Sequence, residues 1–192
     1  REFVEDIGSE AERLNRMTAK LLSLTKVDSQ EPPESELIRM FPTINRVVRM
    51  LRPVAERSSV EILAELEQDS TVLITEDDLY QIVFNLVENG IKYNRAQGSV
   101  TVRVDRTEDL ARLTVADTGV GIPEDALEHI FERFYRVDKA RSRQTGGSGL
   151  GLAIVRAIVL RNRGDIQVES TSGSGTVFTV TFPIFDTEVD ET

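Results

Sequence analysis

The apolar residues divide the chain into one long helix and a following region of mixed helices and strands. Within residues 3–27, apolar side chains recur at alternating steps of three and four residues: Phe3, Ile7, Leu14, Met17, Leu21 and Leu24. This is the period of a helix that packs in a coiled coil or a bundle. Such a helix has nothing of its own to bury against, so we expect it to pair with a partner helix or with a second copy of the chain.

A polar segment with two adjacent prolines ends this pattern. Pro32 and Pro33 lie among polar residues and cannot continue a helix. We therefore predict four parts: a long helix over residues 1–28, a linker over 29–35, a folded domain over 36–185 and an acidic tail over 186–192. Because the chain opens at Arg1 inside the helical pattern, we also expect it to be a fragment of a longer protein.

Within the domain, the pattern predicts helices separated by strands. Helices are predicted over residues 42–57, 77–93, 124–131 and 153–161. Strands are predicted over residues 60–66, 71–75 (joined to the first by a polar turn), 99–106, 110–117, 165–170 and 176–184, after an extended stretch over 36–40. Pro42 suits a first helical turn, Thr75 suits a helix cap, and Pro53 can kink the first helix. The order indicates an α+β fold: a two-layer sandwich with one mixed sheet and helices on one face.

Composition excludes some functions. A net charge of −10 argues against a nucleic-acid surface, which is normally basic. The chain has no cysteine, so it can form neither a disulfide framework nor a thiolate metal site. No stretch approaches the ~20 apolar residues that cross a bilayer.

Glycines gather in residues 145–152, directly before the last predicted helix. Bare backbone N–H groups followed by a helix N-terminus form an anion site, and phosphate is the first ligand to consider. The stretch lacks the Lys-Ser/Thr ending of a Walker A loop, and no acidic residue lies at the distance expected for a dinucleotide ribose. By itself it is either a nucleotide loop or a glycine-rich turn.

Two further groups of residues carry possible chemistry. Asn85 and Asn89 lie one turn apart on a predicted helix, where their amide oxygens could bind Mg²⁺ and Lys92 could reach a phosphate. The alternative is a helix with a polar outer face. Asp117, at a strand end before two glycines, could accept a hydrogen bond from an exocyclic amine such as that of adenine. The alternative is an ordinary turn, which is also the simpler interpretation of residues 173–176.

In their order along the chain, these motifs resemble the N, G1, F, G2 and G3 boxes of sensor histidine kinases. The five matching segments are residues 85–93, 117–121, 131–136, 147–152 and 173–176. The resemblance covers about residues 31–185. It implies the Bergerat-type ATP-binding fold shared with gyrase-type ATPases, chaperones of the ninety-kilodalton class and mismatch-repair ATPases. The preceding helix is similar to the second helix of the family's dimerisation domain, whose first helix carries the phosphoacceptor histidine and is absent from this chain.

The resemblance also implies roles for individual residues. Asn89 is implied as the principal Mg²⁺ ligand with Asn85 beside it, and together with Lys92 these form the catalytic set. Asp117 is implied to hold the adenine amine. The other implied nucleotide-binding residues contact phosphates or ribose, shape the base pocket or flank the phosphates: Tyr93, Gly119, Gly121, Ile122, Tyr135, Arg136, Gly147, Ser148, Gly149, Leu150, Gly151 and Thr176.

The function implied is binding of Mg·ATP and transfer of its γ-phosphoryl group to a histidine on the missing dimerisation helix, for relay to an aspartate of a response regulator. The implied parent is a membrane-anchored bacterial homodimer, of which this is a cytoplasmic domain that meets the membrane only through the absent N-terminal part. Two alternatives stay open. A hydrolytic ATPase of the same fold needs a carboxylate base where this chain has Asn85, and Glu88 is a possible substitute. A non-catalytic nucleotide-binding or dimerisation module is the other.

Some residues depart from the family pattern or fall outside it. Asn94 stands where the family usually has Ser or Thr, Gly90 where Ala is commoner, and residues 162–164 replace a His-Gly-Gly turn. His129, the only histidine, is interpreted as a surface or packing residue. The polar, basic segment 133–147 is predicted to be a mobile loop. Its residues 133–144 are predicted to act as a lid that hinges on the glycine stretch 145–152.

Overall fold

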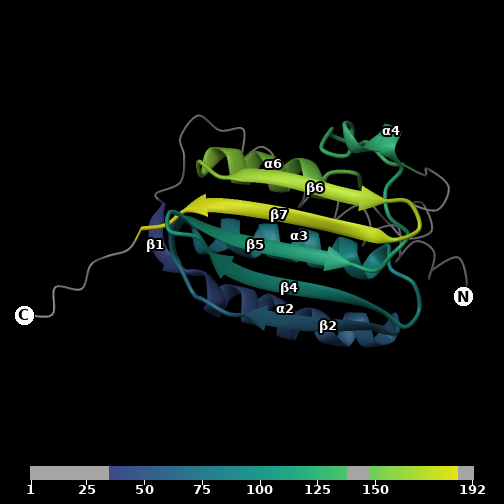
Figure 1. The fold of residues 1–192 in the computed structure, drawn as a ribbon, viewed down its shortest axis with the longest axis horizontal. Helices are drawn as coiled ribbons and strands as arrows, with labels where there is room; N and C mark the ends of the chain where they lie inside the picture. The colour runs from purple at the N-terminus through teal and green to yellow at the C-terminus, as the bar shows by residue number, and fades with distance from the viewer. Residues whose placement is uncertain (1–34, 138–147, 186–192) are drawn as a thin grey trace, which may run out of the picture.

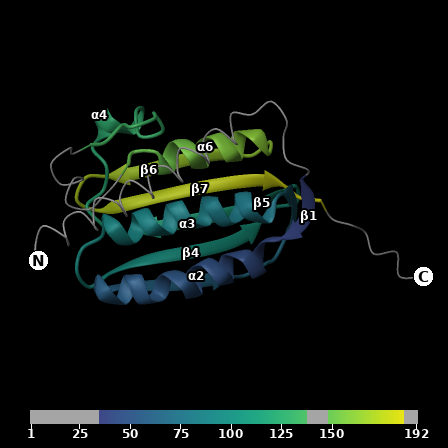
Figure 2. The same cartoon turned by 180° about the vertical axis from the view of Figure 1, so that it is seen from behind.

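The computed structural model of the protein describes residues 35–137 and 148–185. The predicted helix over residues 1–28, the acidic tail and most of the predicted lid lie outside these residues. The described part is a five-stranded sheet with helices on one face (Figures 1 and 2). In spatial order the strands are β2 (Val60–Leu66), β4 (Gly98–Arg106), β5 (Leu110–Asp117), β7 (Gly175–Pro183) and β6 (Asp165–Thr171).

The sheet is mixed, as the sequence predicted. The β2·β4 pair is parallel, and the other three neighbouring pairs are antiparallel. The covering helices are α2 (Met40–Arg57), α3 (Glu76–Lys92) and α6 (Gly151–Arg161), and a short helix, α4 (Glu124–Leu127), lies at one end of the sheet (Figure 1). None of the helices within the described ranges is long and apolar enough to cross a membrane.

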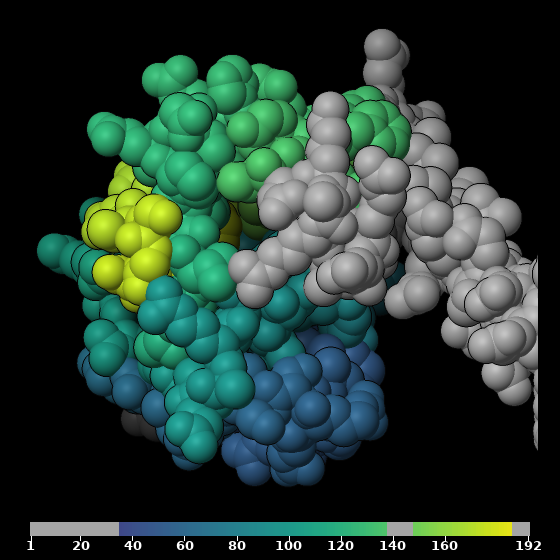
Figure 3. Space-filling view, turned by 90° about the vertical axis from the view of Figure 1, so that its right-hand side faces the viewer, coloured from purple at the N-terminus to yellow at the C-terminus, as the bar shows by residue number. Residues whose placement is uncertain are grey.

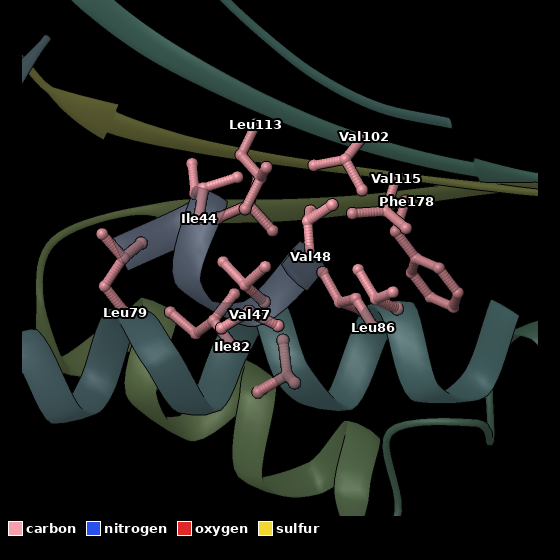
Figure 4. Packing of buried hydrophobic residues seen from close by; sticks show 14 of the residues in the cluster. Ile44, Val47, Val48, Leu79, Ile82, Leu86, Val102, Leu113, Val115 and Phe178 are labelled. Atoms are coloured by element: carbon pink, nitrogen blue, oxygen red, sulfur yellow. The ribbon is translucent and has the colours of Figure 1, made fainter. Parts of the chain in front are cut away.

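The core lies between the helices and the inner face of the sheet. Alternate residues of β4, β5 and β7 are buried, which is the period-2 pattern that the sequence carries. Figure 4 shows side chains of α2 and α3 packed against this face: Ile44, Val47, Val48, Leu79, Ile82 and Leu86 opposite Val102, Leu113, Val115 and Phe178. Full burial of a side chain of this size stabilises the fold by roughly 1.5–3 kcal/mol.

Two predictions around α2 are wrong: its first residue, and the pairing of the strand over residues 71–75 with the strand before it. The helix begins at Met40 rather than at Pro42, and the carboxylate of Asp69 accepts a hydrogen bond from the backbone N–H of Phe41 at 3.0 Å. The polar residues after β2 thus help to cap a distant helix. They do not close a hairpin: β3 (Thr71–Ile74) pairs with β1 (Glu36–Arg39) in a separate two-stranded sheet.

Other boundaries agree with the sequence or shift slightly. Thr75 caps α3 as predicted, since its Oγ1 accepts a hydrogen bond from the N–H of Asp78 at 3.1 Å. The helix predicted over 124–131 ends at Leu127, and turns follow it. Helix α2 is continuous through Pro53.

Helices α3 and α6 run antiparallel and are joined at one end by a buried ion pair. Arg161 Nη2, near the end of α6, donates to both carboxylate oxygens of Asp78, in the first turn of α3, at 2.8 and 2.7 Å. Asn162 Nδ2 adds a third hydrogen bond to Asp78 at 3.2 Å. The turn that replaces the family's His-Gly-Gly is therefore built on side-chain contacts, with Arg163 at a positive φ of 60°.

Candidate nucleotide-binding site

One transverse row of residues crosses the inner face of the sheet and contains Asp117. The register pairs Val100 of β4 with Asp117 of β5, Asp117 with Thr176 of β7, and Thr176 with Ser170 of β6. Directly paired residues project to the same face, so these side chains lie side by side beneath the end of α3. Figure 3 looks onto this end of the molecule, with the β6–β7 turn in yellow and the region of α4 in green.

Asp117 is a partly buried carboxylate held by backbone donors. Its Oδ1 accepts the N–H of Gly119 at 2.8 Å, and the N–H of Thr176 also donates to the carboxylate. Burial raises the pKa of Asp117 above its usual value, although both hydrogen bonds act in the opposite direction. A ligand that donates hydrogen bonds to this carboxylate would offset the penalty of its burial.

The turn after β5 is fixed between two other segments. The N–H of Val120 donates to the carbonyl oxygen of Tyr93, at the end of α3, at 3.0 Å. Gly121 has a φ of +69°, and a Cβ at this position would overlap the carbonyl oxygen of Thr171 in β6. Only glycine fits there without strain. Gly119 and Gly121 are therefore needed for the packing of the turn itself, besides any approach to a base.

A serine at the end of β6 ties this turn to β7. Ser170 Oγ accepts the N–H of Ile122 at 2.8 Å, donates to the carbonyl oxygen of Gly175 at 2.8 Å, and lies 2.9 Å from Thr176 Oγ1. Thr176 is only 5% exposed. The structure thus places the predicted residues Ile122 and Thr176 around one hydroxyl that the sequence gave no reason to select.

Helix α3 brings the predicted Asn85 next to the predicted Gly151. The Asn85 side chain is buried, and its Nδ2 donates to the carbonyl oxygen of Gln81 at 2.8 Å. Its Oδ1 faces the start of α6, where a Cβ on Gly151 would lie 3.0 Å from it. Asn89, one turn further along α3, is half-buried. Both amides provide the hard oxygen atoms that Mg²⁺ prefers.

Two more predicted residues, Lys92 and Tyr93, lie at the C-terminal end of α3. Lys92 Nζ lies 5.2 Å from the centre of the Tyr93 ring, within the range of a cation–π contact. Asn94, which replaces the family's Ser or Thr, donates to the carbonyl oxygens of Gly90 and Ser99 at 3.0 and 2.9 Å. This substitution therefore joins α3 to β4 directly.

The segments on either side of residues 138–147 contact each other. The N–H of Phe134 donates to the carbonyl oxygen of Gly149 at 2.9 Å, and both residues have positive φ values, 65° and 70°. Ser148 Oγ accepts the N–H of Leu150 at 3.4 Å, and the Leu150 side chain is fully buried in the core. Any contact of Leu150 with a ligand would thus be made by its backbone. Gly147 lies outside the described residues.

Arg136 is a half-buried cation with two shielded nitrogen atoms. Its Nε and Nη2 are inaccessible to solvent and have no hydrogen-bond partner among the residues that the structure describes, a condition that is rare for a charged group. It directly follows Tyr135, whose carbonyl oxygen would lie 2.9 Å from a Cβ on Gly149. A phosphate oxygen is a natural partner for such a guanidinium. The residues present therefore fit a nucleotide: an acceptor at Asp117, amide oxygens on α3 and an unmatched cation at Arg136.

His129 is a solvent-exposed surface residue, as the sequence predicted. Its side chain is 48% exposed and its Nδ1 lies 2.7 Å from Glu132 Oε1, which raises the pKa of the imidazole. The ring also lies against Tyr135, with 5.5 Å between the ring centres. Within the described ranges, no cluster of three or more His, Asp or Glu side chains is arranged to hold a metal.

Comparison with known proteins agrees with this fold and site. Residues 74–185 match the family described as histidine kinase-, DNA gyrase B- and HSP90-like ATPase. The sensor histidine kinase RppB of Synechocystis sp. is 36% identical over 97% of this chain and 42% of its own length. WalK of Bacillus subtilis, also a sensor histidine kinase, is 37% identical over 98% of this chain and 31% of its own length. Full-length ShkA in complex with AMPPNP superposes with a TM-score of 0.81 at 27% identity, over 96% of this chain and 38% of that one.

The chain belongs to the histidine kinase-, DNA gyrase B- and HSP90-like ATPase family, in which ATP is the nucleotide bound. Within that family it corresponds to the ATP-binding catalytic domain of sensor histidine kinases, the class to which RppB and WalK belong. The chain spans less than half the length of either relative.

Proposed function

We propose that this domain binds Mg·ATP at the end of the sheet that holds Asp117 and transfers the γ-phosphoryl group to a histidine of the parent protein's dimerisation domain. The observation that carries the proposal is the unmatched guanidinium of Arg136. Shielded guanidinium nitrogens without hydrogen-bond partners cost stability unless an anion joins them, and a nucleotide supplies phosphates.

The proposed contacts fall into two groups, one at the adenine base and one at the phosphates. Asp117 accepts a hydrogen bond from the adenine amine, with Thr176 beside it, and Arg136 and Lys92 contact phosphate or ribose oxygens. The side-chain oxygens of Asn89 and Asn85 would hold Mg²⁺. Bound there, the metal would supply positive charge that offsets the charge on the phosphates, which matters because phosphoryl transfer depends mainly on positioning and electrostatic stabilisation.

Transfer is favoured over hydrolysis by the residue at position 85. A hydrolytic enzyme needs a carboxylate that activates water, and the Asn85 amide is a poor base whose Nδ2 is already bonded to Gln81. The acceptor imidazole supplies the nucleophile for transfer. The likeness to sensor histidine kinases supports a homodimeric parent, with residues 1–28 as its second dimerisation helix, residues 29–35 as a linker and residues 36–185 as the catalytic domain. A response-regulator aspartate would receive the phosphoryl group next.

Titration calorimetry with Mg·ADP tests the nucleotide part of this proposal. We expect binding in the micromolar to sub-millimolar range, and binding should weaken by about 10- to 100-fold in Asp117→Asn, which loses a charged acceptor. Glu124→Gln, an exposed carboxylate on α4, is the matched control and should bind as the unchanged chain does. Absence of heat and of competition with a fluorescent ATP analogue would refute the nucleotide assignment.

Phosphoryl transfer is tested by supplying the acceptor separately. The 192-residue chain should label a separately expressed dimerisation domain with γ-³²P-ATP, and this label should be acid-labile. Chain incubated alone should stay unlabelled, and His129→Ala should not change the result. Multiple-turnover hydrolysis that is abolished by Glu88→Gln would instead support the ATPase alternative.

A further inference from the structure

We propose that Ser170 is a positioning residue that makes the base pocket select a purine with an amino group over one with a carbonyl group at the same ring position. This inference rests on the proposed function, because it concerns how the same pocket chooses its base. The hydrogen bonds around the hydroxyl groups of Ser170 and Thr176 determine which of these groups can donate to a ligand.

Ser170 has one hydroxyl proton, and its neighbours decide where that proton goes. The carbonyl oxygen of Gly175, 2.8 Å away, can only accept, so the Ser170 hydroxyl donates to it. The N–H of Ile122, also 2.8 Å away, can only donate, so it uses one lone pair of Ser170 Oγ. The contact of 2.9 Å between Ser170 Oγ and Thr176 Oγ1 then has one possible direction: Thr176 donates to Ser170.

This direction leaves the Thr176 hydroxyl with lone pairs only. Thr176 lies opposite Asp117 in the register of β5 and β7, and its backbone N–H donates to that carboxylate. Two adjacent side chains, Asp117 and Thr176, therefore present acceptors toward the same part of the site. A 6-amino group offers two protons to these acceptors. A 6-oxo group places a third acceptor against them, and the proton of such a base is on the adjacent N1 instead.

Ser170 also links the two segments that border Asp117, the turn after β5 and the start of β7. By accepting the N–H of Ile122 it holds the turn that follows Asp117, and by donating to Gly175 it holds the start of β7. Loss of the hydroxyl would leave the N–H of Ile122 without this partner and would free the Thr176 proton to point toward the ligand. Weaker binding and weaker discrimination are therefore expected from the same change.

The experiment compares ADP with inosine diphosphate, whose base has a 6-oxo group and a protonated N1 where adenine has a 6-amino group and an unprotonated N1. The dissociation constants of both ligands would be measured by calorimetry for the 192-residue chain and for Ser170→Ala. We expect the unchanged chain to prefer ADP and the ratio of the two constants to fall about tenfold in Ser170→Ala. Ser172→Ala, an exposed serine in the adjacent turn, is the matched control and should keep the ratio.

A second pair of variants separates the hydroxyl from the shape of the side chain. Ser170→Thr keeps a hydroxyl and Ser170→Val has the same shape without one, and both suit a strand. Ser170→Thr should keep the discrimination and Ser170→Val should lose it, which also covers the case in which Ser170→Ala fails to fold. A chain that binds neither ligand would refute the proposed function. A chain that prefers ADP, with an unchanged ratio in folded Ser170→Ala or Ser170→Val, would refute only the role of Ser170.

Discussion

Replacing Asp78 by asparagine should destabilise the domain strongly without damaging the site. Asp78 and Arg161 have side chains that are 10% and 15% exposed, so the ion pair between them is largely shielded from water. Asp78→Asn keeps the shape of the side chain but removes the charge of the carboxylate to which Arg161 Nη2 donates. Breaking a buried pair from one side costs roughly 3–5 kcal/mol. For a domain of this size that corresponds to a fall in Tm of roughly 6–20 °C.

Thermal unfolding followed by circular dichroism measures this effect, with Asp77→Asn as the matched control. Asp77 lies in the same first turn of α3 but is exposed, so its loss should cost only the helix-dipole contribution of roughly 0.3–1 kcal/mol. The double variant Asp78→Leu, Arg161→Met should recover much of the loss, because no charge is left buried and unpaired.

ADP binding by the same variants gives a second test, because the ion pair is distant from the candidate site. The pair lies at the opposite end of the α3·α6 pair from Asn85 and Gly151, so folded Asp78→Asn should bind ADP within about twofold of the unchanged chain. A Tm equal to that of Asp77→Asn would show that the pair contributes nothing, and the reasoning from its burial would be wrong.

Three other substitutions test the site. Burial raises the pKa of Asp117, so its contribution to stability is complete below the unfolded pKa and is lost as the pH rises through the folded value. Asp117→Asn should therefore raise the Tm of the nucleotide-free chain at pH 7 and lose this advantage toward acid pH; an equal or lower Tm at pH 7 contradicts this. Gly121→Ala should lose roughly 2–5 kcal/mol by urea unfolding, because a positive φ and overlap with Thr171 add. Gly173→Ala has a positive φ but a nearest neighbour 3.8 Å away, so it should lose clearly less, and equal losses would contradict the overlap. Arg136→Met should raise the Tm without nucleotide and shrink the Tm increase caused by ADP; a lower Tm without nucleotide would mean that the cation is satisfied.

Local sequence patterns predicted most of the elements. The apolar face of α3 and the alternation in β4 and β5 are encoded within single segments, and these elements were found close to their predicted bounds. The pairing of β3 with β1 was not predictable in this way. It joins two strands that lie on either side of α2 and β2 in the chain, and the contact of Asp69 with the N-terminus of α2, 28 residues earlier, is equally non-local.

In the candidate site, too, the residues within local motifs were predictable and those defined by distant contacts were not. The motif order was enough to select Asn85, Asn89 and Asp117, because each belongs to a recognisable local run. Ser170 belongs to no such run, and its importance comes from three neighbours on two other segments, the turn after β5 and the start of β7. The unmatched state of Arg136 was also invisible, since burial depends on what the rest of the chain packs around a side chain.

The order of strands also has a consequence for synthesis of the protein. Strand β5 occupies the middle of the sheet, and its neighbour β7 is the last strand of the described chain. The two strands pair residues far apart in sequence, such as Leu110 and Pro183. A ribosome that has released residues up to 164 has supplied neither β6 nor β7. At that stage Asp117 has no neighbour on one side, and the apolar edge of β5 is open to pairing with other chains. The base pocket can therefore form only after β7 has left the ribosome, and a nucleotide cannot assist the folding of the earlier segments through this pocket before then.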